Sequence, residues 1–273
     1  MGRVHDTISF LTDYGLADEF VGVCKSVIRT IAPEVAVVDV THDVPPHDIR
    51  AGSLTLVRAV QYLAPGVVLA VVDPGVGTER RAVAIEVGEK GNGDAYFVGP
   101  DNGLLAAAVA MVGGATRAVE LANPEFQLPA PGATFAGRDV FAPAAAHLCL
   151  GVPLTELGPE VNPLGLIPGL VPLSRTGDDG EILAEVLWVD RYGNAQLNVG
   201  PDDLEGFGER ISVLIGEDVR TARRVTAYQK LGPGEVGLVI DSYGLMAVSL
   251  DRASAGEALR LGPGTGVILS AAG

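Results

Sequence analysis

The residues best suited to chemistry lie at the ends of predicted strands. Asp13 follows the apolar run 8–11, and Asp73 follows the run 67–72. Open parallel sheets bind ligands at the carboxyl ends of their strands, so both carboxylates are candidates for a site. Asp13 could accept hydrogen bonds from a diol, and Asp18 could pair with a ligand ammonium. Taken alone, this segment favours plainer roles, a turn aspartate for Asp13 and a helix N-cap for Asp18.

The loop after Asp73 is the second candidate segment. Residues 73–77 read Asp-Pro-Gly-Val-Gly, which predicts a tight turn, and Arg80 and Arg81 follow it. An arginine that turns back toward Asp73 would keep this carboxylate ionised and oriented. Such a group suits the orientation or deprotonation of water. The loop lacks the spacing of a dinucleotide- or phosphate-binding loop, and on its own it indicates only a turn.

Two further segments carry polar residues. Arg138 and Asp139 most simply begin a helix, and the Tyr-Gly-Asn sequence at 192–194 is typical of a hairpin turn. Metal catalysis is not expected, because the four histidines show no ligand spacing and no CxxC pair occurs. The absence of a GxSxG elbow argues against acyl transfer.

Composition limits the class of protein. The chain has 273 residues, of which 48% are hydrophobic and 19% charged, and its formal net charge is −15. This is enough apolar material for a sizeable core, and the acidity makes nucleic acid and anionic membranes poor partners. We expect Cys24 and Cys149 to be buried, reduced thiols. The sequence shows neither a signal peptide nor an apolar run of membrane-spanning length, which predicts a soluble, cytoplasmic protein.

The first two thirds of the chain alternate short apolar runs with amphipathic segments. This pattern is typical of an α/β domain, with a mostly parallel sheet and helices on both faces. The predicted strands are 8–11, 35–40, 67–72, 82–87 and 96–98, and the predicted helices are 20–31, 48–63, 104–111 and 140–150.

The pattern changes after about residue 172, which divides the chain into predicted domains 1–172 and 173–273. Short β-rich runs separated by Gly, Asp and Pro then follow, and they predict a small antiparallel β-barrel or sandwich. The segment 163–179, rich in Pro and Gly, is the expected linker. The predicted strands are 183–189, 195–199, 211–215, 236–240, 245–250 and 266–269.

Seven stretches, in order over almost the whole chain, carry a family pattern. They are LTDYGLADEFVG at 11–22, VVDVTHDVPPHDI at 37–49, VVDPGVGTERRAV at 71–83, VGPDNGLL at 98–105, TFAGRDVFAP at 134–143, VDRYGNAQLN at 189–198 and DSYG at 241–244. Together they resemble the S-adenosyl-L-methionine (SAM) hydroxide adenosyltransferases, or SAM hydrolases, whose relatives include the fluorinase and chlorinase. Each stretch is weakly specific alone, but seven in register are strongly specific. The family's α/β plus small-barrel architecture agrees with the division made above.

The resemblance implies roles for residues of the α/β domain. Asp13 would hold the ribose hydroxyls, and Asp18 would meet the methionine ammonium. His47 stands where the fluorinase has a tryptophan beside the nucleoside. Phe135 is implied as a further substrate contact.

The resemblance also implies substrate contacts in the β-rich domain. Asp190 would share the ammonium, Ser242 would lie near the methionine carboxylate, Asn194 would bind the adenine edge, and Tyr192 would pack against the adenine ring. Tyr243 and Ala253 complete the implied set. The family places SAM between the amino-terminal domain of one subunit and the carboxy-terminal domain of its neighbour. It thus implies a homotrimer, with a dimer of trimers as an alternative.

The catalytic set shows one departure from the family. Hydrolytic members use an Asp-Arg-His set around the attacking water. Asp73 and Arg80 match the first two members, whereas Ala136 occupies the position of the histidine. Two explanations are open at this point, a natural variation in which Asp73 and Arg80 position water alone, or an engineered change.

The resemblance implies hydrolysis of SAM to adenosine and L-methionine, without a cofactor or a metal ion. A chlorinase-like halogenase is one alternative, and Asp73 argues against it because a carboxylate repels a halide. A non-catalytic SAM or adenosine sensor is the other alternative, and it is suggested by Ala136. A purely structural protein would leave the seven matching stretches unexplained.

Overall fold

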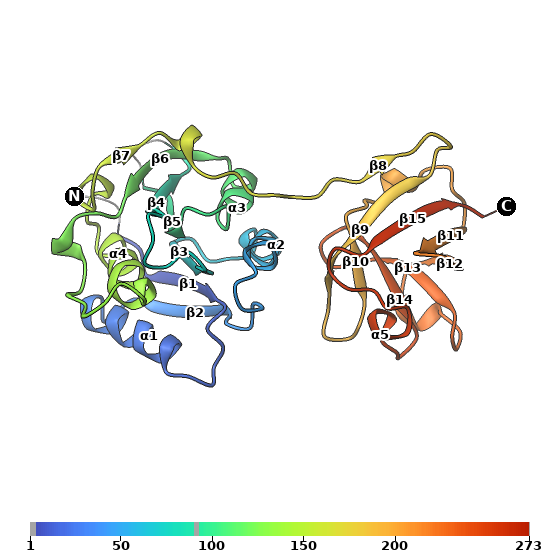
Figure 1. Cartoon of the computed structure of the whole chain (residues 1–273), viewed down its shortest axis with the longest axis horizontal. Coiled ribbons are helices and arrows are strands. Elements are labelled where there is room, and N and C mark those ends of the chain that lie inside the picture. Colours follow the sequence, from blue (N-terminus) through green and yellow to red (C-terminus); the bar gives the residue numbers. More distant parts are fainter. Residues whose placement is uncertain (1–3, 90–92, 273) are drawn as a thin grey trace. The chain divides into compact units, whose positions relative to one another are not determined.

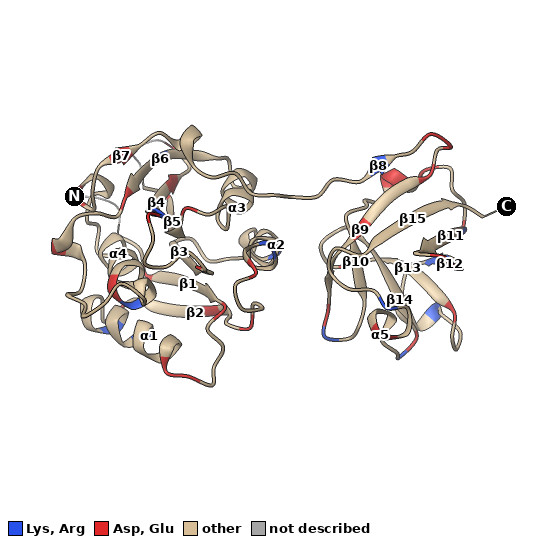
Figure 2. Cartoon of the chain, in the orientation of Figure 1, with Lys and Arg blue, Asp and Glu red and all other residues tan. Residues whose placement is uncertain are grey.

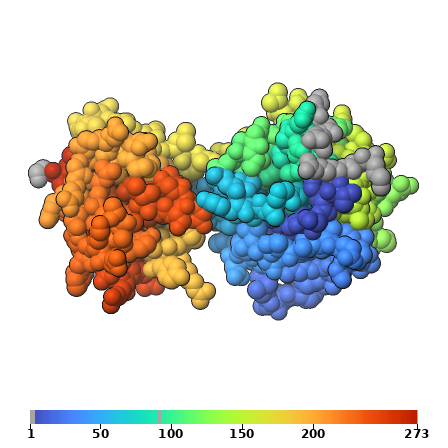
Figure 3. Space-filling view, turned by 180° about the vertical axis from the view of Figure 1, so that it is seen from behind, coloured from blue at the N-terminus to red at the C-terminus, as the bar shows by residue number. Residues whose placement is uncertain are grey.

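The computed structural model describes residues 4–89 and 93–272. It divides the chain into two compact units, the first ending at Leu170 and the second beginning at Val171. Each unit is built from one continuous stretch of chain, as the grouping of colours in Figure 3 shows. The boundary that the sequence predicts, after residue 172, lies close to this division.

The first unit is organised around a seven-stranded sheet in the order β2-β1-β3-β5-β4-β6-β7. Neighbours from β2 to β5 pair in parallel, and β4 pairs antiparallel with both β5 and β6. β6 therefore runs in the same direction as β5, and only β4 and β7 are reversed. This confirms the expected mostly parallel sheet. The strands are β1 (Thr7–Thr12), β2 (Ala36–Thr41), β3 (Val67–Val71), β4 (Ala82–Val87), β5 (Ala95–Pro100), β6 (Ala115–Glu120) and β7 (Glu160–Val161).

Helices cover both faces of this sheet, as expected (Figure 1). α1 packs with α4 on one face, and α2 packs with α3 on the other. The alternation along β3 explains the two cores, because Leu69 joins the α1/α4 side whereas Val68 and Ala70 join the α2/α3 side. The helices are α1 (Phe20–Ile31), α2 (Ile49–Val60), α3 (Ala106–Met111) and α4 (Ala142–Cys149).

Local sequence explains where these helices lie. In α1 the buried residues Val21, Cys24 and Ile28 recur at helical spacing, and Pro33 follows the end of the helix. α2 begins after Asp48, whose side chain accepts a hydrogen bond from the backbone N–H of Ala51 at 2.8 Å. The region predicted as one helix at 140–150 is instead a π-helical segment followed by α4.

The second unit is a closed β-barrel. Its strands follow the order β10-β14-β13-β12-β11-β15-β9-β8, and pairing of β10 with β9 closes seven of them into a ring. Neighbours are antiparallel apart from β12 and β13, which are parallel. The expected barrel is thus confirmed, with one parallel pair that the sequence did not predict. Its elements are β8 (Arg175–Thr176), β9 (Ile182–Val189), β10 (Ala195–Leu197), β11 (Arg210–Ile215), β12 (Asp218–Val225), β13 (Val236–Ile240), β14 (Met246–Leu250), α5 (Ala255–Ala258) and β15 (Gly266–Ala271).

Short helical turns join the main elements. They are η1 (Pro124–Phe126), η2 (Gly137–Phe141), η3 (Leu154–Glu156), η4 (Pro163–Gly165), η5 (Asp202–Leu204) and η6 (Tyr228–Lys230). None of the helices in the described stretches combines the length and apolarity needed to cross a lipid bilayer.

Acidic residues exceed basic ones by 34 to 19, and they occur on both units (Figure 2). Several arginines form ion pairs with acidic residues, so their positive charges are already neutralised locally. These pairs include Arg80–Asp73, Arg81–Asp101, Arg117–Glu160 and Arg223–Glu235.

Because the two units have separate hydrophobic cores, a core substitution in one unit is expected to lower the stability of that unit alone. Leu69 is fully buried in the core of the first unit, so Leu69→Ala is expected to destabilise that unit by about 2–5 kcal/mol. Most helical residues belong to the first unit, whereas the single tryptophan, Trp188, lies in β9. The urea midpoint measured by far-ultraviolet circular dichroism should therefore fall. An equal fall in the Trp188 fluorescence midpoint would show that the two cores unfold together instead.

Candidate functional site

A pocket with a cavity volume of about 240 Å³ lies at the carboxyl edge of the first sheet. Asp13 directly follows β1, and Asp73 follows β3 by two residues. Five of the predicted site residues line this pocket, together with six residues that were not predicted. The lining residues are Asp13, Tyr14, Phe20, Pro46, His47, Asp73, Val76, Thr134, Phe135, Ala136 and Gly137.

Asp73 and Arg80 form a two-pronged ion pair beside this pocket. Arg80 Nε donates to Asp73 Oδ1 at 3.0 Å, and Arg80 Nη2 donates to Asp73 Oδ2 at 2.5 Å. Their side chains are only 5% and 12% exposed, so the pair is largely shielded from water. The guanidinium also lies over the Phe141 ring, 5.4 Å from its centroid, where a cation is favoured.

The intervening loop brings the two partners together. Val76 N–H donates to the Asp73 carbonyl at 3.2 Å, and the Thr78 hydroxyl donates to the Gly75 carbonyl at 2.7 Å. Gly77 adopts φ 77°, a left-handed conformation that glycine tolerates well. The turn predicted from Pro and Gly therefore returns the chain so that Arg80 faces Asp73.

Burial dominates the ionisation of Asp73. It raises the pKa of this carboxyl above the ordinary value of 3.8, and the charge and hydrogen bonds of Arg80 oppose the rise without cancelling it. The sequence argument considered only the arginine and omitted the desolvation. A raised pKa makes Asp73 a stronger base than an exposed aspartate, as proton abstraction from water requires.

Asp13 fixes the loop that carries His47. The backbone N–H of His47 donates to Asp13 Oδ2 at 2.9 Å, across a sequence separation of 34 residues. His47 itself has φ 67°, a left-handed conformation that is uncommon without glycine and is often retained at functional sites. Asp13 is thus a long-range tether in addition to its place in the bend that follows β1.

Ala136 lies at the start of an irregular helical segment. It is the N-cap of the π-helix η2, a helix type that is frequent at functional sites. The Asp139 carbonyl of this segment accepts a hydrogen bond from Leu128 N–H at 2.9 Å. Arg138 and Asp139 lie within the first turn, as expected, and form an ion pair at 2.6 Å. This segment places Ala136 at the pocket wall, near Asp73.

Aromatic side chains make up much of the remaining wall. Phe135 contacts Phe20 with ring centroids 5.1 Å apart and Tyr14 with centroids 5.8 Å apart. Sequence reasoning missed Tyr14, Phe20 and Thr134, although all three lie in family-matching stretches. Their chemical types alone indicated no role.

Asp18 lies outside this pocket. Its side chain is exposed and is not among the residues that line the cavity. The N-cap position of α1 is Glu19, which makes no side-chain capping bond, so the N-cap role considered for Asp18 is wrong. Its implied contact with a methionine ammonium stays a prediction.

The predicted residues of the second unit gather around hollows of their own. Five of them line a hollow of about 260 Å³, and Ala253 lines another that shares four of those five. The first hollow is lined by Trp188, Asp190, Arg191, Tyr192, Asn194, Gln196, Tyr228, Asp241, Ser242, Tyr243 and Ala247. Trp188, Gln196, Tyr228 and Asp241 were missed by the sequence analysis.

Two loops of the same form border this hollow. Asp190 accepts hydrogen bonds from the N–H groups of Tyr192 and Asn194, each at 2.8 Å, in the Asp-Arg-Tyr-Gly loop. Asp241 does the same for Tyr243 at 2.8 Å and Leu245 at 3.1 Å in the Asp-Ser-Tyr-Gly loop. The sequence repeats the pattern Asp-x-Tyr-Gly at 190–193 and 241–244, a signal that the sequence analysis did not use. Each aspartate orders its loop, and the first loop presents Tyr192, which is 81% exposed.

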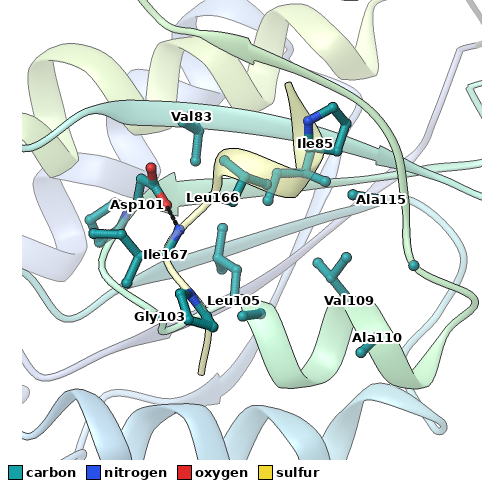
Figure 4. Close-up of a pocket in the computed structure, with 15 residues that line it drawn as sticks. Val83, Ile85, Asp101, Gly103, Leu105, Val109, Ala110, Ala115, Leu166 and Ile167 are labelled. Atoms are coloured by element: carbon teal, nitrogen blue, oxygen red, sulfur yellow. Dashed lines mark hydrogen bonds between the residues drawn. The ribbon is translucent and has the colours of Figure 1, made fainter. Parts of the chain in front are cut away.

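A further cavity of about 220 Å³ lies elsewhere on the first unit, between β4, α3 and the segment around η4 (Figure 4). Its lining is mostly apolar, with Val83, Leu105 and Leu166 pointing into it. Asp101 is the acidic group in its wall, and this carboxylate already accepts hydrogen bonds from Arg81 and from Ile167 N–H. No predicted site residue lines this cavity.

Comparison with known proteins finds relatives that match almost the whole chain. A (R)-S-adenosyl-L-methionine hydrolase from Salinispora tropica is 47% identical over 94% of this chain and 95% of its own length. A fluorinase from Actinopolyspora mzabensis is 26% identical, over 90% of this chain and 91% of its own length. The crystal structure of a conserved protein from Thermotoga maritima superposes with a TM-score of 0.87 at 33% identity, covering 96% of this chain and 99% of that one.

The profile of the SAM hydroxide adenosyltransferase N-terminal domain matches residues 8–158, and that of the C-terminal domain matches residues 184–268. The resemblance seen in the seven stretches is confirmed, and this chain belongs to the SAM hydroxide adenosyltransferase family.

Proposed function

We propose that this chain hydrolyses SAM to adenosine and L-methionine, with water attacking the ribose 5′ carbon. The observation that carries the proposal is the shielded ion pair between Asp73 and Arg80, because its aspartate lines a pocket that Asp13 also lines. A relative 47% identical over nearly the whole chain is named for the hydrolysis of this sulfonium compound.

The chemistry is an in-line displacement. The oxygen of water forms a bond to the 5′ carbon while the C–S bond breaks, and the bonding electron pair goes to sulfur. Asp73 accepts the proton that water releases, and Arg80 stabilises the developing hydroxide. Alignment of water opposite the C–S bond supplies much of the rate enhancement, because the reactants are held at reacting distance.

The reaction as proposed uses neither a cofactor nor a metal ion. The sulfonium is an excellent leaving group, because it departs as neutral methionine and needs no acid. Its positive charge fades in the transition state, so an apolar surrounding favours the reaction over bulk water. The rings of Tyr14, Phe20 and Phe135 provide such a surrounding in the pocket.

Substrate binding follows from the same proposal. Asp13 holds the ribose hydroxyls in the first unit, and Tyr192 and Asn194 bind adenine from the second. Asp190 Oδ1 accepts two backbone hydrogen bonds and Oδ2 accepts one from Asn194 Nδ2, so Oδ2 retains one acceptor position for the methionine ammonium. The exposure of Tyr192 supports this role, because a ring left 81% open to solvent is available to stack on a ligand.

We further propose a homotrimer in which each site joins two subunits, with a dimer of trimers as the larger alternative. The presence of candidate residues on two separate units supports a shared site. The cytoplasm is the proposed location, and the free thiols of the buried Cys24 and Cys149 fit a reducing compartment.

The stereochemistry of the sulfonium defines the substrate further. The Salinispora relative is named for the (R) configuration of SAM. We propose that this chain also prefers that epimer. Inversion at sulfur exchanges the positions of the methyl group and the lone pair, which changes the contacts that the pocket wall makes with the reacting centre.

Product analysis with SAM tests the reaction class. We expect adenosine and methionine, formed faster from the (R) than from the (S) epimer, and no 5′-chloro-5′-deoxyadenosine when chloride is added. An ionised Asp73 repels a halide at short range by about 1–4 kcal/mol, which is the reason for the last expectation. Chloride-dependent formation of the chloro product would make the chain a halogenase. Tight binding of SAM without any turnover would make it a sensor, the alternative that Ala136 supports.

Removal of the base should slow the chemical step. Asp73→Asn keeps the shape of the side chain but accepts no proton, so kcat is expected to fall by about 10²- to 10⁴-fold. Asp101→Asn is a matched control, because Asp101 pairs with Arg81 away from this pocket. An equal loss in both variants would point to general damage and would contradict the role of Asp73.

The raised pKa of Asp73 predicts the acid side of the pH profile. The ionised form is active, so kcat/KM should decline as pH falls through a pKa above 3.8, and reach a plateau above it. The residual activity of Asp73→Asn should not show this decline at acid pH. If the variant showed the same decline as the wild type, the titrating group would be a residue other than Asp73.

Restoration of the family histidine should increase turnover. Ala136→His supplies a polar group near the water position, and an increase in kcat of up to about 10²-fold is expected for a recovered acid–base group. Ala136→Leu, which adds bulk without a polar group, serves as the control. If Ala136→His released adenosine no faster than the wild type, position 136 would have no part in activating water here.

A further inference from the structure

A tyrosine hydroxyl lies beside the position of the missing histidine. A Cβ atom built on Gly137 would stand only 2.2 Å from Tyr14 Oη, so the hydroxyl fills the space next to this glycine. Gly137 directly follows Ala136, and both residues line the pocket together with Tyr14 and Asp73. Ala136 carries a methyl group where the family has an imidazole, and the residue that follows it lies against a tyrosine O–H group.

The backbone of Tyr14 is anchored by a hydrogen-bond chain that runs from the buried Thr12 to the exposed Asp39. Its N–H donates to Thr12 Oγ1 at 3.2 Å, and Thr12 Oγ1 bonds to His42 Nδ1 at 2.9 Å. His42 Nε2 in turn is hydrogen-bonded to Asp39 Oδ1 at 3.0 Å, so the imidazole links Thr12 to Asp39. Thr12 and His42 are almost completely buried. The chain holds Tyr14 at the end of β1.

The ring of Tyr14 is held from both sides. Phe20 lies with its ring centroid 5.8 Å away and tilted, and Phe135 lies at the same distance, edge to face. No hydrogen bond joins the hydroxyl to any other residue in the described part of the chain. The two phenylalanine rings thus position the Tyr14 hydroxyl, and among the described residues this hydroxyl has no hydrogen-bond partner.

The hydroxyl remains protonated over the range of ordinary assays. Burial is the main cause that raises the pKa of Tyr14 well above 10, and the negative charges of Asp13 and Asp73 raise it further. Tyr14 therefore does not compete with Asp73 for the proton of water. A neutral hydroxyl both donates and accepts hydrogen bonds, so it is suited to orient a water molecule.

We propose that the Tyr14 hydroxyl holds the attacking water in place of the family histidine. This inference rests on the proposed function. Water donates one hydrogen to Asp73 and is hydrogen-bonded to Tyr14 Oη, which directs a lone pair of its oxygen at the 5′ carbon. As the C–O bond forms and the C–S bond breaks, the proton passes to Asp73, and Tyr14 keeps its own.

The near-isosteric change Tyr14→Phe isolates the hydroxyl, because the ring contacts with Phe20 and Phe135 are retained. We expect kcat for adenosine release to fall by about 10²-fold, as for loss of one positioned donor, with KM changed less than about threefold. Tyr62→Phe is the matched control, since Tyr62 is 74% exposed and lies outside the pocket. Its activity should equal that of the wild type.

A double-mutant cycle with position 136 gives a readout that a packing role would not produce. If the hydroxyl and a histidine serve the same water, Tyr14→Phe should cost less in the Ala136→His background than in the wild type. Equal losses in both backgrounds, or a loss seen in KM alone, would overturn the inference. Circular dichroism and SAM binding by calorimetry establish that each variant is folded and that its pocket is intact.

A second variant keeps the inference testable if Tyr14→Phe does not fold. Gly137→Ala places a methyl group where the hydroxyl lies and should displace it, with a comparable loss of kcat. Full activity in Gly137→Ala would contradict the assignment. A wild type that converts neither SAM epimer would refute the proposed hydrolysis itself, whereas an active wild type with an equally active Tyr14→Phe refutes only the role of Tyr14.

Discussion

The buried ion pair between Asp73 and Arg80 is the constraint on which the site depends. Removing two charges from water is costly, and replacing such pairs by apolar residues often stabilises a protein. A pair whose side chains are 5% and 12% exposed is therefore poorly explained by stability alone. It is explained by chemistry, because burial raises the pKa of Asp73 while Arg80 keeps the carboxylate oriented and supplies a positive charge for a developing hydroxide.

The rest of the first unit serves to place this pair against a ligand. Parallel strands bring Asp13 and Asp73 to one edge of the sheet, although sixty residues separate them in sequence. The left-handed backbone at His47 and the π-helix after Ala136 are local irregularities, and both segments contribute residues to the pocket wall. Both are unfavourable in isolation, and both are held by contacts made elsewhere, Asp13 to the His47 N–H and Leu128 N–H to the Asp139 carbonyl. Such irregular positions are typical of sites under functional selection.

In the second unit, two ordered loops between strands carry the candidate binding residues. In each of the two Asp-x-Tyr-Gly loops, the aspartate accepts backbone hydrogen bonds that order the loop. The tyrosine of each loop lines the same hollow. The ring of Tyr192 is rigid, flat and mostly exposed, so stacking a base on it requires little further ordering. Two carboxylates, Asp190 and Asp241, line this hollow together with one arginine, Arg191, and their negative charge suits a substrate with a net positive charge.

Hydrophobic periodicity by itself determined the class of fold. The strands predicted at 82–87 and 236–240 were observed with those bounds, because both are apolar and buried along almost their full length. β12 was missed because its first half is polar and exposed, and only pairing with β11 and β13 makes Asp218–Val225 a strand.

The family pattern also indicated the Asp73–Arg80 pair, which local turn chemistry can build. Tertiary structure alone decided that burial outweighs the arginine in setting the pKa of Asp73, and that the Tyr14 hydroxyl lies against Gly137, the residue after Ala136. Desolvation and a contact across 123 residues of sequence depend on packing, which no local pattern specifies.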